Sequence, residues 1–316
     1  MRGIPDAPLT LFESFAAAGV LPESMQRLVF RSRIRTQLAD ARKRGEFSPA
    51  GRARMLESLS QGSLADEVAT AEPEETPASF FSLWLGPRMK YSCGLWSSAR
   101  TLEEADEAML ALVCERAGVA DGMDILDLGA GWGALTCYIA ERFPKARILA
   151  LTRSRAQAEF IRTRAADSNV TVLHADMRTV DLAAKFDRVL AIEAIEHVRN
   201  PLALQARIDG WLVPGGRLFV QAIAHRELAY PLPSGVMLAD DTLPHCTAQW
   251  VIDGGHYVRT IVAWRSRLTA ARRGASAIVG AGGYRRWRAF LVACEELFGW
   301  DEGRQWRVIH QVFDRN

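Results

Sequence analysis

Several common signatures are missing from this sequence of 316 residues. The five cysteines are scattered and form no C-x-x-C pair, so neither a zinc site nor a disulfide framework is supported. Free thiols in a reducing compartment are therefore expected. Lys and Arg number 39 against 37 Asp and Glu, which leaves a net charge of only +2. Without a large basic excess, nucleic acid is not expected as a partner.

Two further absences concern membranes and metals. The N-terminus holds no uninterrupted apolar run long enough for a signal peptide or a membrane span, so we expect a cytoplasmic protein. His225, His245 and His256 show no metal-ligand spacing with one another, and we expect no metal.

The sequence is rich in apolar residues, which recur in a regular order. Hydrophobic residues make up 49% of the chain, enough to bury a large core, as one enlarged domain or as a domain with a cap. From about Asp124 to Ile223, apolar runs alternate with helical patterns, which predicts an α/β fold with a parallel sheet and right-handed crossovers. The expected core strands are 124–128, 147–152, 170–174, 187–192 and 217–223, and a final strand is expected at 306–313.

The first of these strands ends in glycines at alternate positions, beginning with Gly129 and Gly131. Glycine takes positive φ readily and lets the backbone approach a ligand. The spacing is not that of dinucleotide folds, and Thr152 stands where such a fold would place an acid for the ribose. Asp176 and Met177 follow the third strand, where they could meet an adenine edge and ring face. This order of parts suggests S-adenosylmethionine as cofactor.

The fourth strand leads into Glu193, Glu196 and His197, at relative positions i, i+3 and i+4. If this segment makes one helical turn, the three side chains share a face above the carboxyl edge of the sheet. Carboxylates there could attract an ammonium group, and an imidazole could accept its proton near neutral pH. The plainer alternative stays open, because glutamates near a helix start and a lone histidine are often structural.

Separated motifs give the chain a family resemblance. Segments 88–94, 101–105, 126–133, 192–197 and 255–260 follow one another as in the cyclopropane-fatty-acyl-phospholipid synthase superfamily. Within it, the chain resembles most the coclaurine N-methyltransferase branch, over nearly everything from Phe80 to Phe313. The resemblance implies a class I, Rossmann-like methyltransferase that uses S-adenosylmethionine.

The resemblance also suggests roles for individual residues. Tyr91 and Ser92 would touch the methionine part of the cofactor, with Cys93 near the reacting methyl group. Thr152 and Gln157 would replace the missing ribose-binding acid.

In the matching N-methyltransferases, the residues at the positions of Glu193, Glu196 and His197 hold and deprotonate the amine. In cyclopropane synthases, Glu196 and His197 would instead match part of a bicarbonate site, together with Cys93, Tyr257 and a histidine on the fifth strand. Gln221 occupies that last place here, and a neutral amide cannot replace a titratable imidazole. We count Cys93, Gln221 and Tyr257 as candidate substrate contacts.

The first part of the chain has a different character. Residues 9–60 show helical periodicity and carry the most basic stretch of the sequence. A solvated helix face is one interpretation of these arginines, and attraction to an anionic membrane surface is the other. Residues 69–79 are expected as a linker or lid, in which 73–75 do not reproduce the family's His-Tyr-acid motif.

These observations predict a helical N-terminal region over 1–85 and a methyltransferase domain over 86–316, with a substrate cap at about 226–300. The expected activity is transfer of a methyl group to the nitrogen of a small aromatic or cyclic amine. The alternative is methyl or methylene transfer to a lipid acyl chain, which alone would call for membrane contact. A third hypothesis is a non-catalytic cofactor-binding protein. We expect a monomer or a homodimer.

Overall fold

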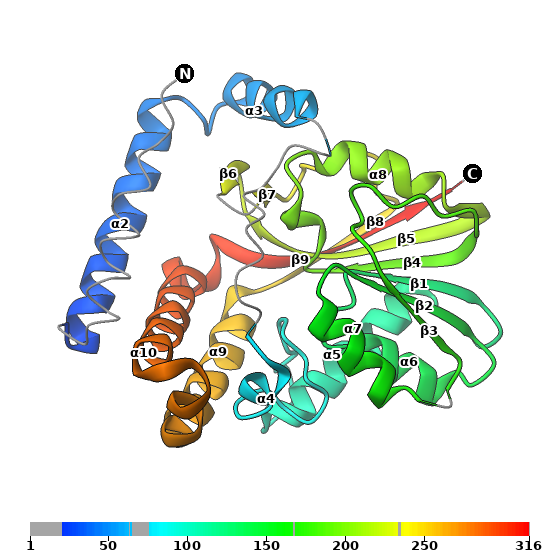
Figure 1. The fold of residues 1–316 in the computed structure, drawn as a ribbon. Coiled ribbons are helices and arrows are strands. Elements are labelled where there is room, and N and C mark those ends of the chain that lie inside the picture. The colour runs from blue at the N-terminus through cyan, green and yellow to red at the C-terminus, as the bar shows by residue number, and fades with distance from the viewer. Residues whose placement is uncertain (1–20, 63, 65–75, 167, 233–234, 316) are drawn as a thin grey trace.

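The computed structural model describes residues 21–62, 64, 76–166, 168–232 and 235–315. The predictions for residues before 21 and for the linker at 69–75 lie outside these ranges. Within them, the chain forms a nine-stranded, mostly parallel sheet with helices on both faces (Figure 1), so the predicted α/β class is confirmed.

The strand order in this sheet is β3-β2-β1-β4-β5-β7-β6, with β9 antiparallel to β5 and β8 antiparallel to β9. The strands are β1 (Asp124–Leu128), β2 (Arg147–Thr152), β3 (Val170–His174), β4 (Phe186–Ile192), β5 (Leu212–His225), β6 (Tyr230–Leu232), β7 (Gly235–Ala239), β8 (Ala248–Ile252) and β9 (Trp306–Asp314). Strands β1 to β5 are parallel, so their carboxyl ends lie along one edge of the sheet, where ligands of such folds bind.

Helices cover both faces of the sheet. They are α2 (Glu23–Lys43), α3 (Pro49–Gln61), α4 (Ala78–Phe81), α5 (Leu102–Ala117), α6 (Ala134–Arg142), α7 (Arg155–Arg164), α8 (Pro201–Asp209), α9 (Gly254–Ala270) and α10 (Arg272–Phe298). Because successive strand residues point to opposite faces, Ile125 and Leu190 join a core with α5 and α6, while Leu126 and Val189 join one with α8. The short 3-10 turns η1 (Ile195–His197) and η2 (Trp300–Gly303) complete the described elements.

Some expected boundaries are wrong. The proline and glycines of 214–216 predict a turn, but this segment lies inside the long β5, at a register shift opposite β4 between Phe186 and Arg188. The apolar run before Gly86 and Pro87 predicts a helix over 80–85, but α4 ends at Phe81, although Trp84 and Leu85 remain buried. The amphipathic pattern of 287–298 predicts a helix beginning at Trp287, but α10 begins at Arg272, with a break at Gly280, whose φ is +73°.

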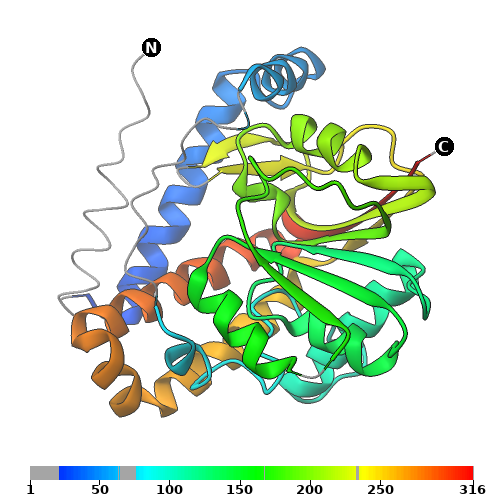
Figure 2. The same ribbon diagram turned by 45° about the vertical axis from the view of Figure 1, so that its right-hand side comes forward.

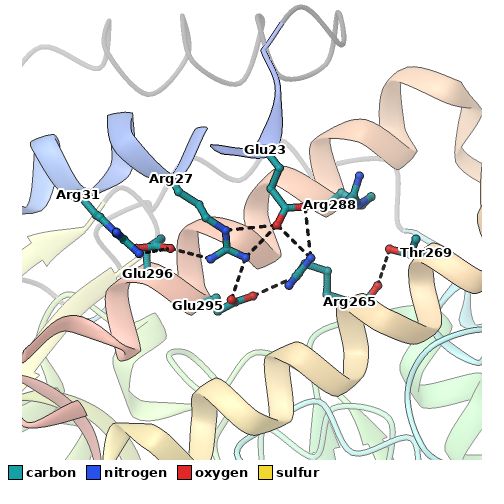
Figure 3. Close-up of polar contacts among 8 residues, drawn as sticks. All are labelled: Glu23, Arg27, Arg31, Arg265, Thr269, Arg288, Glu295 and Glu296. Atoms are coloured by element: carbon teal, nitrogen blue, oxygen red, sulfur yellow. Dashed lines mark hydrogen bonds and ion pairs between the residues drawn. The ribbon is translucent and has the colours of Figure 1, made fainter. Parts of the chain in front are cut away.

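The basic helix α2 lies on the outer side of α10, away from the sheet (Figures 1 and 2). Two of its arginines, Arg27 and Arg31, reach glutamates of α10 (Figure 3). Arg27 Nη1 donates to Glu296 Oε1 of α10 at 2.6 Å, and Arg31 binds the same carboxylate. Glu23 of α2 in turn accepts from Arg288 Nη2 at 2.7 Å and from Arg265 of α9. Alternating charges therefore fasten α2 to the two C-terminal helices.

Candidate active site

A cavity of about 600 Å³ opens at the carboxyl edge of the parallel strands, and α9 and α10 form its far wall. The sequence-predicted residues in its lining are Tyr91, Ser92, Gly129, Gly131, Thr152, Gln157, Asp176, Met177, Glu193, Glu196, His197, Gln221 and Tyr257. Cys93 is fully buried and is not among the lining residues. Because of the strand order, the residues that follow β1, β2 and β3 lie at one end of the cavity, and the acidic residues that follow β4 lie at the other.

The glycine turn after β1 shapes the first end of the cavity. Gly129 has φ +79°, and a Cβ there would lie 2.7 Å from the Cβ of Ala194 and 3.5 Å from Met177 Cε. Gly131 also has positive φ, but a Cβ there would meet nothing within 4 Å. The amides of Gly129 and Ala130 both donate to the Leu151 carbonyl, so they are engaged within the sheet. The turn thus offers space for a ligand rather than those two amide donors.

Polar groups at the ends of β2 and β3 suit a nucleoside. Thr152 Oγ1 donates to Gln157 Oε1 at 2.7 Å, which leaves the Gln157 NH₂ as the group that can donate to a ribose hydroxyl. Asp176 accepts from the Arg178 guanidinium at 2.5 and 2.9 Å. Although partial burial opposes it, this contact lowers the pKa of Asp176, so the carboxylate stays ionised and keeps lone pairs for an exocyclic amine. These residues fit S-adenosylmethionine.

Glu193 is held rigidly at the other end of the cavity. It takes a left-handed backbone conformation, with φ +49°, directly after β4. Its Oε1 accepts from the Cys93 amide at 3.0 Å and from Gln221 Nε2 at 2.8 Å, and its Oε2 accepts from the Tyr257 hydroxyl at 2.6 Å. Both oxygens of the Glu193 carboxyl group therefore have donors from three different parts of the chain, which fix its position in the wall.

Glu196 lies in different surroundings. One oxygen accepts from the Ile223 amide at 2.6 Å, while no hydrogen-bond donor of the described residues reaches Oε2. Burial, with the nearby charge of Glu193, raises the pKa of Glu196 to about 8. Of the two neighbouring carboxyl groups, Glu196 is thus the one whose surroundings suit taking and giving a proton near neutral pH.

His197 completes the acidic end on its solvent side. It is exposed and lines the cavity. The turn η1 holds Glu196 and His197 but not Glu193, so the three residues do not lie on one helical face as the spacing suggested. All three nevertheless line the cavity, with the left-handed residue Glu193 lying between β4 and the turn.

The loop before α5 contributes through its backbone. Lys90, itself buried, donates to Ser92 Oγ at 2.8 Å and to the Cys93 carbonyl. This arrangement points the Cys93 amide at Glu193. Burial, and then the charge of Glu193, raise the pKa of the Cys93 thiol well above its ordinary value, so the thiol stays protonated.

Most of the apolar wall of the cavity was not predicted from the sequence. Its residues from α9 and α10 are Ile261, Trp264, Phe290, Leu291, Cys294 and Phe298. Trp264 lies 5.3 Å from the Tyr91 ring, and Phe298 stacks on Tyr257 at 4.2 Å, measured between ring centroids. The amphipathic pattern of these helices predicts burial but does not tell which buried residues face a cavity.

Several known proteins are similar to this chain in sequence and in fold. The family model described as mycolic acid cyclopropane synthetase matches residues 74–234. The (S)-coclaurine N-methyltransferase of Thalictrum flavum subsp. glaucum is 33% identical, with 83% of each chain covered. The chain belongs to the mycolic acid cyclopropane synthetase family. The family resemblance stated from the motifs is confirmed.

Other members of the family extend the comparison. The cyclopropane-fatty-acyl-phospholipid synthase of Escherichia coli (strain K12) is 30% identical, covering 72% of this chain and 64% of its own. The crystal structure of coclaurine N-methyltransferase bound to N-methylheliamine and SAH superposes with a TM-score of 0.89 at 27% identity. That superposition covers 98% of this chain and 100% of the other.

Membership of the family makes the protein a methyltransferase that uses S-adenosylmethionine, as the motifs predicted. In the part of the chain that the structure describes, no helix combines the length and apolar character needed to cross a membrane. Nor do the described His, Cys, Asp and Glu side chains gather in a group of three or more that could hold a metal ion.

Proposed function

We propose that the protein transfers a methyl group to the nitrogen of a small aromatic or cyclic amine. The observation that carries this proposal is the pair of carboxyl groups of Glu193 and Glu196 in a cavity whose wall from α9 and α10 is apolar and aromatic. Relatives named for coclaurine, tetrahydroprotoberberine and pavine N-methylation support an amine as acceptor. A cationic amine with a flat ring suits carboxylates beside aromatic rings.

In this proposal, the first end of the cavity holds the cofactor. Gly129 and Gly131 leave room for it, Thr152 and Gln157 meet its ribose, and Asp176 and Met177 meet its adenine; Tyr91 and Ser92 line the side toward its methionine part. When bound, S-adenosylmethionine supplies an electrophilic methyl group on a sulfonium. The protein's task is to align a neutral amine with that methyl group and to accept a proton.

The acidic end performs that task. Glu193, held by Cys93, Gln221 and Tyr257, attracts and orients the positively charged amine. Glu196 Oε2 accepts the proton of the nitrogen, because its raised pKa makes it a stronger base than an ordinary carboxylate. His197, at the exposed mouth, passes that proton to solvent.

We infer that the segment expected as a cap, about 226–300, covers the acceptor. Leu232, Val236 and Met237 from β6 and β7 line the cavity, as do the α9 and α10 side chains. Another part of this segment, β8, pairs with β9 and extends the sheet. The cover is therefore built mainly from the β6–β7 hairpin and the two helices.

The test uses the purified chain with S-adenosylmethionine and a panel of tetrahydroisoquinoline and arylalkyl amines, with methylated products detected by mass spectrometry. Turnover of a cyclic amine is expected, with Glu196→Gln lowering kcat by roughly 10²-fold or more while SAH affinity stays within about twofold. Glu159→Gln, at an exposed position on α7, is the matched control.

Two other outcomes would decide against the proposal. Methylene transfer to unsaturated phospholipid vesicles, with no amine methylated, would assign the protein to the lipid-modifying members of the family. Binding of SAH with no turnover of any acceptor class, unchanged by Glu196→Gln, would indicate a non-catalytic cofactor-binding protein.

A further inference from the structure

A line of buried polar side chains runs from Glu193 away from the cavity. Gln221 Nε2 donates to Glu193 Oε1 at 2.8 Å, and Gln221 Oε1 lies 3.0 Å from His310 Nε2. His310 Nδ1 lies 3.0 Å from Arg116 Nη1. Gln221 and His310 are fully buried and face each other directly across β5 and β9. Arg116 of α5 also lies over the Trp250 ring of β8, 4.6 Å from its centroid.

The donor at one end determines every hydrogen bond along this line. A guanidinium only donates, so His310 Nδ1 must accept from Arg116. The ring is neutral, because burial and the charges of Arg116 and Lys90 lower the pKa of His310 to about 3. Its proton therefore sits on Nε2 and is donated to Gln221 Oε1. The Gln221 amide then has only its NH₂ group to offer to Glu193.

We propose that Arg116 and His310 are positioning residues, which fix the Gln221 carboxamide so that its NH₂ group, and not its oxygen, faces Glu193. This role rests on the proposed function, in which Glu193 attracts and orients the amine. A carboxamide is nearly symmetric in shape, so an unrestrained Gln221 could turn over. Two oxygens would then face each other, and Glu193 Oε1 would lose the hydrogen bond from Gln221.

Gln221 differs from the other groups around Glu193 in what sets its orientation. The other groups that face it are the Cys93 amide from the loop before α5, the Tyr257 hydroxyl from α9, and the Glu196 carboxyl after β4. The first two already donate, and Glu196 adds a negative charge nearby. The Gln221 NH₂ group is thus the donor whose direction depends on side chains outside the cavity.

Two substitutions of His310 separate positioning from packing. His310→Gln can still accept from Arg116 with its oxygen and donate to Gln221 with its NH₂ group, whereas His310→Leu fills space and does neither. Gln311→Leu is the matched control, since it removes a buried amide from the next residue of β9, which points to the opposite face. SAH affinity, measured by calorimetry, is expected to stay within about twofold for all three variants.

With tetrahydroisoquinoline as the probe amine, His310→Leu is expected to lower kcat/KM by at least about tenfold, as for loss of one hydrogen bond to a charged group. His310→Gln should stay within about threefold of the parent protein, and so should Gln311→Leu. Equal losses in His310→Leu and His310→Gln would overturn the proposal, because packing alone would then explain both.

A second measurement needs no substrate. Proton–nitrogen correlation spectra of the protein with isotope-labelled histidine should show His310 as the neutral form protonated on Nε2 between about pH 5 and pH 8, assigned by its loss in His310→Gln. A ring protonated on Nδ1, or a charged ring, would overturn the proposal. If no cyclic amine is methylated but this signal is found, the proposed function fails while the hydrogen-bond order stands.

Discussion

The sharpest prediction concerns Glu196, whose surroundings disfavour the ionised form of its carboxyl group. Burial and the charge of Glu193 raise its pKa from 4.5 to about 8, and no donor of the described residues reaches its Oε2. Glu196→Gln removes the ionisable group and keeps its shape. We expect this substitution to stabilise the folded protein at alkaline pH while it impairs catalysis.

The sign follows from proton binding. Because the folded state holds the Glu196 proton more tightly than the unfolded chain, the unfolded state loses its proton first as pH rises. Stability contributed by this proton is complete below pH 4.5 and is lost between pH 4.5 and about 8. At about 1.36 kcal/mol per pKa unit, the loss approaches roughly 5 kcal/mol at the upper end.

The glutamine variant avoids this loss but leaves its own NH₂ group without an acceptor, at a cost of about 1–2 kcal/mol. Glu196→Gln should therefore be slightly less stable than the parent protein at pH 5 and more stable by about 3 kcal/mol at pH 8.5. In a chain of this size, such a gain corresponds to a rise in Tm of several degrees.

Thermal unfolding of both proteins between pH 5 and pH 9 measures the difference, with Glu159→Gln as the control at an exposed site. A difference that does not change with pH, or a parent protein that is the more stable one at pH 9, would refute the reasoning. Loss of turnover in the same variant would show that the destabilised carboxyl group is retained for its chemistry.

Two further substitutions test the glycine turn and the attachment of α2. Gly129→Ala should weaken SAH binding by about tenfold or more, because its Cβ would lie 2.7 Å from Ala194. Gly131 shares the positive φ without that contact, so Gly131→Ala should change SAH affinity by less than about threefold. Calorimetry measures both affinities. Glu296→Gln should lower the stability of the protein by about 2 kcal/mol at pH 7, since it weakens the ion pairs with two arginines of α2. The contacts with these arginines lower the pKa of Glu296 against the opposing effect of burial, so its contribution is complete above pH 4.5 and is lost as pH falls further. Chemical denaturation at pH 7 and pH 4 measures this, and an effect no larger than that of the exposed control Glu302→Gln would contradict it.

Local patterns in the sequence were sufficient for most of the fold. The predicted bounds of β2 and β3 agree with the structure. Thr101 and Glu104 have the spacing of a capping box, and Thr101 caps α5, accepting from the Glu104 amide at 3.2 Å. These features depend on neighbours in sequence. Pro214–Gly216 carries turn residues, yet it lies within β5, where the Gly215 amide donates to the Arg315 carbonyl and the Gly216 carbonyl accepts from the Arg315 amide. Contacts with a segment distant in sequence overrode the local signal there.

The same distinction applies to the site. Residues at the ends of parallel strands can be predicted, because the fold brings those ends to one edge, and thirteen of the predicted residues do line one cavity. The walls from α9 and α10 and the position of His310 could not be predicted, since they depend on how far helices pack and on the register of β5 with β9. For Cys93, the backbone amide reaches Glu193, while the residue itself is fully buried and does not line the cavity.

The arginines of α2 show how a basic sequence can differ from a basic surface. Arg27 contacts Glu295 and Glu296, and Arg31 contacts Glu296 as well. Arg35 and Arg42 lie over aromatic rings of the protein itself. An anionic membrane would have to compete with these contacts, each of which would be lost on release of the arginine. Part of the charge that suggested a lipid surface is therefore used within the molecule, where Arg27 and Arg31 hold α2 against α10, the helix that carries cavity-lining residues.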